Sequence, residues 1–122
     1  MTEPLKSGAI IEYLLDTYDK DHLISVPDPL ERNLLRQWIY FQIAFQGPVL
    51  SNVFFFTHID PNTKARAHLV KESNRILHVL DQALRDREWL VGDKCSAADL
   101  IYLPFQMGTG VSCHSSLPGG VP

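Results

Sequence analysis

The chain has 122 residues, which is enough for one domain and too few for two of ordinary size. Its net charge of −3 gives no basic footprint for nucleic acid or for an anionic membrane surface. Apolar residues make up 45% of the sequence, as in an ordinary globular protein. No apolar run reaches the roughly 18 residues of a membrane-spanning helix, and the first residues lack the layout of a signal peptide, so neither feature is expected.

The cysteines and histidines exclude two further classes of protein. Cys95 and Cys113 are the two cysteines, which is too few for a disulfide scaffold, and they lack Cys-x-x-Cys spacing. A reducing compartment is the simplest interpretation, so we expect a cytoplasmic location. The five histidines are scattered, and no two lie four residues apart on one helix. The sequence therefore predicts no metal site.

Apolar residues recur at helical spacing over most of the chain, so the predicted fold class is all-α. The first predicted helix runs from Ser7, whose hydroxyl suits an N-cap, to about Tyr18. Residues 22–29 form a predicted linker, because its two prolines disfavour helical backbone at the residue before each. A long helix is predicted from about Leu30 to the mid-40s, and an extension toward Phe56 is left open.

Several breaks are predicted in the second half of the chain. Gly47-Pro48 should interrupt or kink the long helix, because proline removes one backbone hydrogen bond. Asp60-Pro61 should open the next helix, with the aspartate as its N-cap, and this helix should end near Arg85. Pro104 should kink or stop a last short helix. The predicted tail, residues 108–122, is rich in glycine, proline and serine, and we expect it to be disordered.

Ser96 and Asp99 lie three residues apart where this last helix should begin. That spacing is typical of a capping box, in which each side chain accepts a backbone N–H at the helix start. A catalytic Ser–Asp pair is the other interpretation, but no histidine nearby in sequence would complete a triad. We therefore predict a structural role for both residues.

Two residues at predicted helix starts are candidates for chemistry. The hydroxyl of Ser7, together with free backbone N–H groups and the helix dipole, favours binding of a carboxylate. A plain N-cap is the alternative role for Ser7, and it is the commoner one. Cys95 precedes a helix start, where a thiol pKa can be lowered, although burial would make the same thiol unreactive.

Aromatic side chains cluster on the predicted long helix. Such side chains commonly line apolar ligand pockets, and ordinary core packing is the alternative. Three adjacent rings at 54–56 cannot all face one core, so one of them should meet a partner or a ligand. The cluster consists of Trp38, Tyr40, Phe41, Phe45, Phe54, Phe55 and Phe56.

Two segments together resemble the glutathione transferases, with the character of the fungal Ure2-like group. Residues 7–19 (SGAIIEYLLDTYD) resemble the last helix of that family's glutathione-binding, thioredoxin-like domain. Residues 89–100 (WLVGDKCSAADL) resemble the capping-box segment of its helical domain. The resemblance implies that residues 1–21 are a remnant of the first domain. It also implies that residues 30–107 form a helical bundle like the C-terminal domain.

The resemblance also implies a function and its residues. Active members of the family add the thiol of glutathione to small apolar electrophiles, and they commonly form two-fold dimers. Ser7 matches the family's serine that binds the γ-glutamyl carboxylate of glutathione. Phe41, Phe45 and Phe54 would contribute to the electrophile pocket. The expected partners are therefore glutathione, an electrophile, and a second copy or a full-length relative.

The sequence also departs from the family pattern. Lys6 stands where the family usually has Glu or Gln, and nothing upstream matches the region that activates the thiol, so no catalytic residue is assigned. We expect impaired conjugation in this chain. A non-catalytic helical module that pairs with full-length relatives is the alternative, and a fragment without function is a third. The face formed by Ile10, Ile11 and Leu14 should be exposed, forgoing roughly 1.5–3 kcal/mol of burial for each side chain. We therefore expect marginal stability, or dependence on a partner.

Overall fold

The computed structural model describes the backbone of residues 5–114 and the side chains of residues 5–108. Every regular element in this part of the chain is helical, which confirms the all-α prediction. Two of the elements, η1 and η2, are turns of wider π-helix within a longer helix. The elements are α1 (Ser7–Tyr18), α2 (Pro29–Phe41), η1 (Gln42–Gln46), α3 (Gly47–Phe54), η2 (Phe55–Ile59), α4 (Thr63–Ala83), α5 (Ala97–Leu100) and α6 (Leu103–His114).

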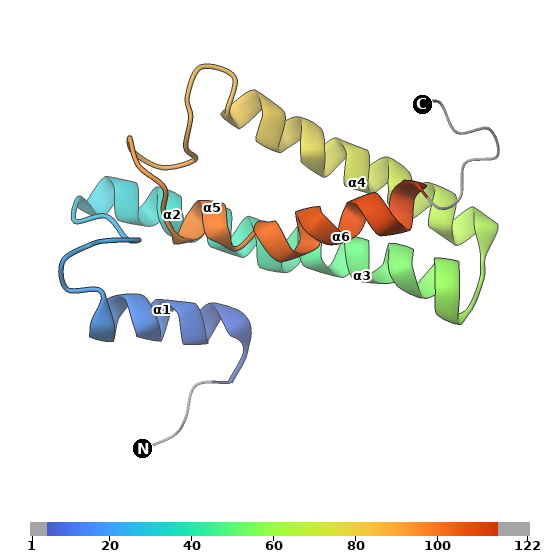
Figure 1. Ribbon diagram of the computed structural model, residues 1–122, viewed down its shortest axis with the longest axis horizontal. Helices are drawn as coiled ribbons and strands as arrows, with labels where there is room; N and C mark the ends of the chain where they lie inside the picture. The colour runs from blue at the N-terminus through green and yellow to red at the C-terminus, as the bar shows by residue number, and fades with distance from the viewer. Residues whose placement is uncertain (1–4, 115–122) are drawn as a thin grey trace.

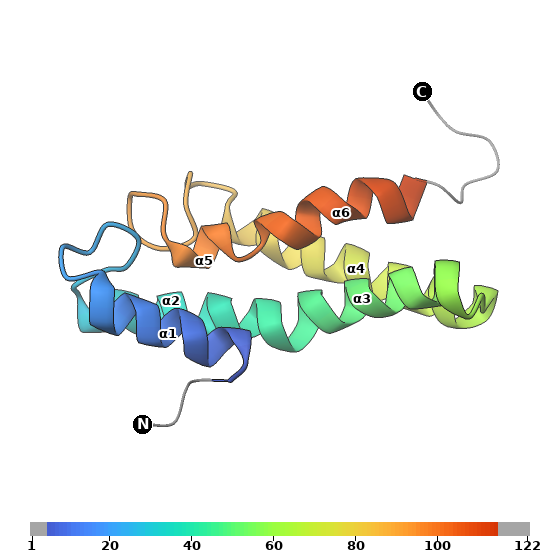
Figure 2. The same cartoon turned by 60° about the horizontal axis from the view of Figure 1, so that its bottom comes forward.

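The helices form an elongated bundle (Figure 1). The continuous run α2–η1–α3–η2 is its spine, and α4 folds back along α3. The C-terminal helices cover the spine from another side, with α5 against α2 and α6 against α3. Helix α1 lies beside α2, at the end of the bundle away from the α3–α4 turn (Figure 2).

The long helix begins at a proline-containing cap and continues through a second proline. Asp28 caps it by accepting the backbone N–H groups of Leu30 and Glu31, each at 3.0 Å. Pro48 does not stop the helix, because the preceding turn is a π turn in which the Gly47 N–H donates to the carbonyl of Gln42. The wider turn accommodates the residue that lacks an N–H, and the helix continues to Ile59. The predicted interruption is therefore a local widening.

This helix of 31 residues is long and apolar enough to cross a membrane, judged by length and composition alone. Core helices of soluble proteins pass the same test, so the finding is weak evidence for a span. One face of the helix is packed inside the bundle, where Leu35, Ile39 and Val53 are each at most 1% exposed. We interpret it as the core helix of the bundle.

Helix α4 begins later than predicted. Its N-cap is Asn62, whose side chain accepts the N–H of Ala65 at 3.0 Å, so the prediction of Asp60 as the cap is wrong. The backbone N–H of Asp60 instead donates to the carbonyl of Phe55 and closes the last turn of the long helix. The helix ends at Ala83, close to the predicted end.

The C-terminal helices also differ from the prediction. The expected break falls between α5 and α6, and Pro104 lies in the first turn of α6, where its missing N–H is tolerated. The backbone stays helical through His114, so the predicted disorder does not begin at Gly108. Once a helix is nucleated, each added residue gains one hydrogen bond, which favours continuation. The rest of the predicted tail, residues 115–122, lies outside the described residues.

Candidate functional site

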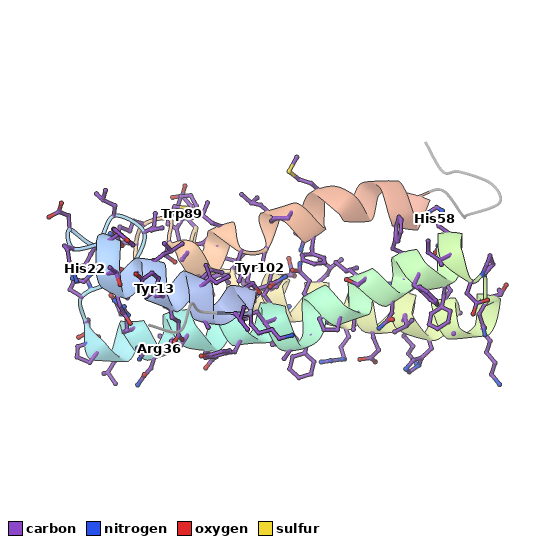
Figure 3. All side chains as sticks on the ribbon, turned by 90° about the horizontal axis from the view of Figure 1, so that it is seen from below. Tyr13, His22, Arg36, His58, Trp89 and Tyr102 are labelled. Atoms are coloured by element: carbon purple, nitrogen blue, oxygen red, sulfur yellow. The ribbon has the colours of Figure 1, made fainter. Side chains whose placement is uncertain are left out.

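Helix α1 is fixed to α2 by a ladder of polar contacts. Glu12 and Asp16 lie one turn apart on α1 and face α2. Tyr40 Oη donates to Glu12 Oε1 at 2.9 Å, and Arg36 Nε lies 3.6 Å from the same oxygen. Arg32 forms an ion pair with Asp16. These five residues are called the α1 ladder below, and Figure 3 shows its Arg36 on α2 beside α1.

The start of α1 rests on the π turn of the long helix. Gly8 is buried, and a Cβ added to it would lie 2.7 Å from Cδ1 of Ile43. Glycine allows this approach between α1 and η1, whereas a larger residue would require the Ile43 side chain to shift. The start of α1, where Ser7 lies, is therefore placed against the middle of the long helix.

Ser7 is the first residue of α1 and is exposed. The cap position belongs to Lys6, which adopts a left-handed backbone with φ of 75°. The prediction of Ser7 as the N-cap is therefore wrong. The hydroxyl stands instead at the exposed first turn, beside backbone N–H groups that have no partner within the helix. This arrangement is compatible with carboxylate binding.

The aromatic residues predicted for the electrophile pocket fall into two groups. The ring of Phe41 packs between those of Trp38 and Phe45, with centroid distances of 5.8 and 5.3 Å. Phe54 lies nine residues beyond Phe45, or about 13 Å along the helix. Its ring neighbour is His58, at 4.8 Å. Phe45 and Phe54 are 45% and 50% exposed, and neither they nor Phe41 line the pockets described below.

The three adjacent phenylalanines do not all face the core, and the expected contact of one ring with a partner or a ligand stays a prediction. Phe54 and Phe55 are 50% and 40% exposed, and Phe56 is half-buried. Phe55 and Phe56 form an edge-to-face pair at 5.2 Å. The rings thus divide between the surface and the interior, and two of them are available to a partner.

An apolar groove runs between α1, the following loop and α5. One part, of about 230 Å³, is lined by Leu14, Ile24, Leu100 and their neighbours. A second part, of about 290 Å³, adds Tyr18 and Leu23. We call the two parts the α1 groove. Its rim is exposed, because Leu14, Tyr18 and Leu23 are 47%, 70% and 74% accessible.

The predicted exposure of the α1 face is correct for two of its three residues. Ile10 and Leu14 are 39% and 47% exposed. Ile11 is half-buried and packs against the core cluster, so the prediction was wrong for this residue. Helix α1 turns its Ile11 and Leu15 toward the bundle and presents Ile10 and Leu14 to solvent.

A further pocket was not suggested by the sequence. It has about 450 Å³ and lies where η2 meets the start of α4. Its wall includes Phe56, Thr57, His58 and Arg66, and Arg66 Nε donates to Thr57 Oγ1 at 2.9 Å. Figure 3 places His58 at the opposite end of the molecule from Arg36, so this pocket is remote from that part of the α1 ladder.

Ser96 and Asp99 form a capping box at the start of α5. The Asp99 carboxylate accepts the backbone N–H groups of Leu90 and Ser96, both at 2.9 Å, and the Ser96 hydroxyl at 3.2 Å. Ser96 is fully buried. The neighbouring Ala97 N–H donates to the carbonyl of Ile24 at 2.7 Å and ties the linker to α5. Ser96 and Asp99 therefore have a structural role at the start of α5.

Cys95 does not have the environment of a reactive thiol. Burial, together with the nearby carboxylate of Asp99, raises the pKa of the Cys95 thiol. Burial and Asp99 likewise raise the pKa of Tyr102, whose hydroxyl donates to the carbonyl of Trp38 at 2.6 Å. Both groups are therefore held in their neutral forms. Of the two interpretations of Cys95, the structure favours the unreactive one.

The predicted linker contains an ordered loop that the sequence did not reveal. The carboxylate of Asp19 accepts the backbone N–H groups of Leu23, Ile24 and Ser25 at 2.8 to 3.1 Å. Burial alone would raise the pKa of Asp19, but these hydrogen bonds and one from the Ser25 side chain lower it below its usual value. The side chain of Lys94 also donates to the carbonyl of His22.

No group of three or more His, Cys, Asp and Glu side chains that could hold a metal ion occurs within the described part of the chain. A family model described as glutathione S-transferase, C-terminal domain, matches residues 47–107. The chain belongs to the glutathione S-transferase family. The resemblance to this family is thereby confirmed, and the matched range includes residues 89–100.

Relatives and solved structures agree with this assignment. The chain is 41% identical over 113 residues to the glutathione S-transferase-like protein gedE of Aspergillus terreus, covering 84% of this chain and 50% of that protein. It therefore spans about half the length of this curated relative. Among solved structures, the glutathione transferase URE2P6 of Phanerochaete chrysosporium, in complex with oxidized glutathione, superposes with a TM-score of 0.83 at 38% identity. That match covers 87% of this chain and 50% of URE2P6.

A second structure from the same fungus extends the comparison. Ure2p5 of Phanerochaete chrysosporium, cocrystallized with 1-(S-glutathionyl)-2,4-dinitrobenzene, gives a TM-score of 0.87 at 27% identity. The match covers 96% of this chain and 56% of Ure2p5. The helical bundle and α1 of this chain thus have counterparts in proteins crystallised with glutathione derivatives.

Proposed function

We propose that this chain contributes the helical part of a glutathione transferase site, in which Ser7 binds the γ-glutamyl carboxylate of glutathione. Family membership supports this role, and so does the glutathione derivative in each of the two superposed structures. The observation that carries the proposal is the placement of Ser7. It lies exposed at the first turn of a helix that the α1 ladder and the Gly8–Ile43 contact hold on the bundle.

The second substrate in the family's conjugation reaction would be a small apolar electrophile. For an aryl chloride, the glutathione thiol loses its proton, its sulfur bonds to the ring carbon and chloride leaves. The exposed rings of Phe45 and Phe54, with Phe41 behind Phe45, would contribute apolar surface for the electrophile. No residue of this chain is assigned to thiol activation, so we propose that the polypeptide by itself binds glutathione weakly and does not accelerate its conjugation. The proposed location is the cytoplasm, which a fluorescent fusion would test.

The Ser7 proposal is tested by retention of the purified chain on immobilised glutathione. We expect the chain to be retained weakly and Ser7→Ala to lose this retention, because the substitution removes the hydroxyl that would contact the carboxylate. Ser51→Ala is the matched control, since Ser51 is an exposed serine on α3 and should leave retention unchanged. Equal retention of the two variants would show that Ser7 has no part in the binding.

The second candidate is a non-catalytic module that pairs with full-length relatives. The specific observation in its favour is the amount of apolar surface on two helices. Ile10, Leu14 and Tyr18 of α1 are 39%, 47% and 70% exposed. Leu34 and Tyr40 on the long helix are 41% and 51% exposed. Burying such surface is the usual driving force for association.

Pairing is tested by light scattering after size-exclusion chromatography, with the chain alone and mixed with the purified Aspergillus terreus relative. We expect either a mass of two copies or a mixed complex. Leu14→Asp should weaken the complex if the α1 face takes part, and Thr17→Asp, at an exposed polar position on α1, is the control. A monomer in both samples would exclude this candidate. A random-coil circular dichroism spectrum would support the third hypothesis, a fragment without function.

A further inference from the structure

Gln46 is a polar side chain buried inside the bundle. It is 1% exposed, and within the described part of the chain neither the oxygen nor the nitrogen of its amide has a hydrogen-bond partner. Buried polar groups are bonded in the great majority of cases, to protein or to ordered water. An amide that kept both atoms unpaired would forfeit a sizeable part of a small net stability.

Two further polar side chains are buried on the elements that meet at this π turn. Gln42, at the start of the same π turn, is 4% exposed. Ser73 is also 4% exposed, and it lies on α4, which contacts η1. We call Gln42, Gln46 and Ser73 the polar layer. It interrupts the apolar face that Ile39 and Val53 continue on either side along the long helix.

The backbone of the π turn adds to the polarity. Pro48 supplies no N–H, so one carbonyl in the preceding turn lacks its usual helical donor. The packing beside Gly47 would also accept a methyl group. A Cβ added there would lie 3.4 Å from the carbonyl oxygen of Gln42, 3.6 Å from its Nε2 and 3.7 Å from the ring of Phe105, which are ordinary contacts. The π turn thus combines the unpartnered amide of Gln46 with a carbonyl that lacks its helical donor, and a methyl-sized group beside Gly47 would meet only ordinary contacts.

We propose that Gln46 binds an internal water molecule in the polar layer. A buried water makes two to four hydrogen bonds and is found where buried polar groups would otherwise lack partners. Here it accepts from the amide nitrogen of Gln46 or donates to its oxygen, and it takes its remaining bonds from the polar layer and the π turn. The water site does not depend on glutathione binding. The proposal of this site therefore stands whether or not the proposed function is correct.

The experiment counts long-lived internal waters in the full chain by ¹⁷O magnetic relaxation dispersion. Gln46→Met keeps the length of the side chain and removes both polar atoms, so we expect at least one long-lived water fewer than in the wild type. Gln37→Met is the matched control, because Gln37 is an exposed glutamine on α2. This variant should hold the same number of long-lived waters as the wild type. The same count in Gln46→Met as in the wild type would overturn the proposal.

A second measurement needs no variant and covers the case in which Gln46→Met fails to fold. In the wild-type chain, the side-chain amide protons of Gln46 should show a nuclear Overhauser effect to water with the sign of a long-lived complex. Contacts from these protons only to Gln42 or Ser73, with no water signal, would show that the amide is bonded within the protein. That result would overturn the proposal.

Discussion

Replacement of Asp99 by alanine is expected to destabilise the bundle by roughly 2–4 kcal/mol. The carboxylate accepts three hydrogen bonds, from the backbone of Leu90, the backbone of Ser96 and the Ser96 hydroxyl. Ser96 is fully buried, so water cannot replace the lost acceptor freely. The same capping box positions Ala97, whose N–H holds the linker at Ile24. Loss of Asp99 should therefore loosen α5 and the attachment of α1 together.

Chemical denaturation followed by circular dichroism measures this effect. Asp93→Ala is the control, because Asp93 is an exposed aspartate six residues earlier in the same segment. It should change the unfolding free energy by no more than about 0.5 kcal/mol. A stability of Asp99→Ala equal to that of Asp93→Ala would mean that the capping box does not hold this part of the fold.

Truncation of Ile39 is expected to lower the unfolding free energy by as much as the loss of Asp99, or more. For Ile39→Ala we expect a loss of roughly 2–5 kcal/mol. Ile39 has no exposed surface and lies in the core cluster with Leu35, Leu80 and Tyr102. Removing three carbons leaves a cavity that these neighbours fill only in part. Since folded domains keep only about 5–15 kcal/mol in total, and α1 leaves apolar surface uncovered, much of the variant should be unfolded at room temperature.

The long helix supplies its own control for this prediction. Ile59 ends the same continuous helix and is 63% exposed. Ile59→Ala should lower the unfolding free energy by less than about 1 kcal/mol, because little buried surface is lost. Thermal unfolding of the two variants compares them directly. Equal losses would mean that the helix is not packed through the face that contains Ile39.

Local features of the structure could be predicted from the sequence. The helices follow from apolar spacing, and the capping box follows from Ser96 and Asp99 because its partners lie within one turn of each other. The N-cap of the long helix at Asp28 is of the same local kind. Segments 7–19 and 89–100 also carried the family resemblance, and the family model matches a range that includes the second of them.

Features that depend on distant contacts could not be predicted. Ser7 was predicted to be the N-cap of the first helix. In the structure Gly8 packs against Ile43, and the N-cap is Lys6. Pro48 was expected to interrupt or kink the long helix, and nothing in the local sequence shows that a π turn accommodates it. The α1 ladder joins residues up to 28 positions apart, and no pattern within either helix reveals that partnership.

In the candidate site, too, local features could be predicted and the spatial arrangement could not. Phe41, Phe45 and Phe54 were grouped because they are aromatic residues on one helix, yet the structure pairs Phe54 with His58 and places Phe45 beside Phe41. Helical rise separates the two groups, and π turns at η1 and η2 alter the rotation between successive side chains. The assignment of these residues to one pocket stays a prediction.

The central proposal is that these helices hold only one part of a glutathione site and do not catalyse conjugation by themselves. The direct measurement is the rate at which the purified 122-residue chain forms 1-(S-glutathionyl)-2,4-dinitrobenzene from glutathione and the corresponding aryl chloride. A full-length glutathione transferase serves as the positive control. We predict a rate equal to that of the uncatalysed reaction. Turnover that rises with the concentration of this chain and disappears when the chain is denatured would contradict the account.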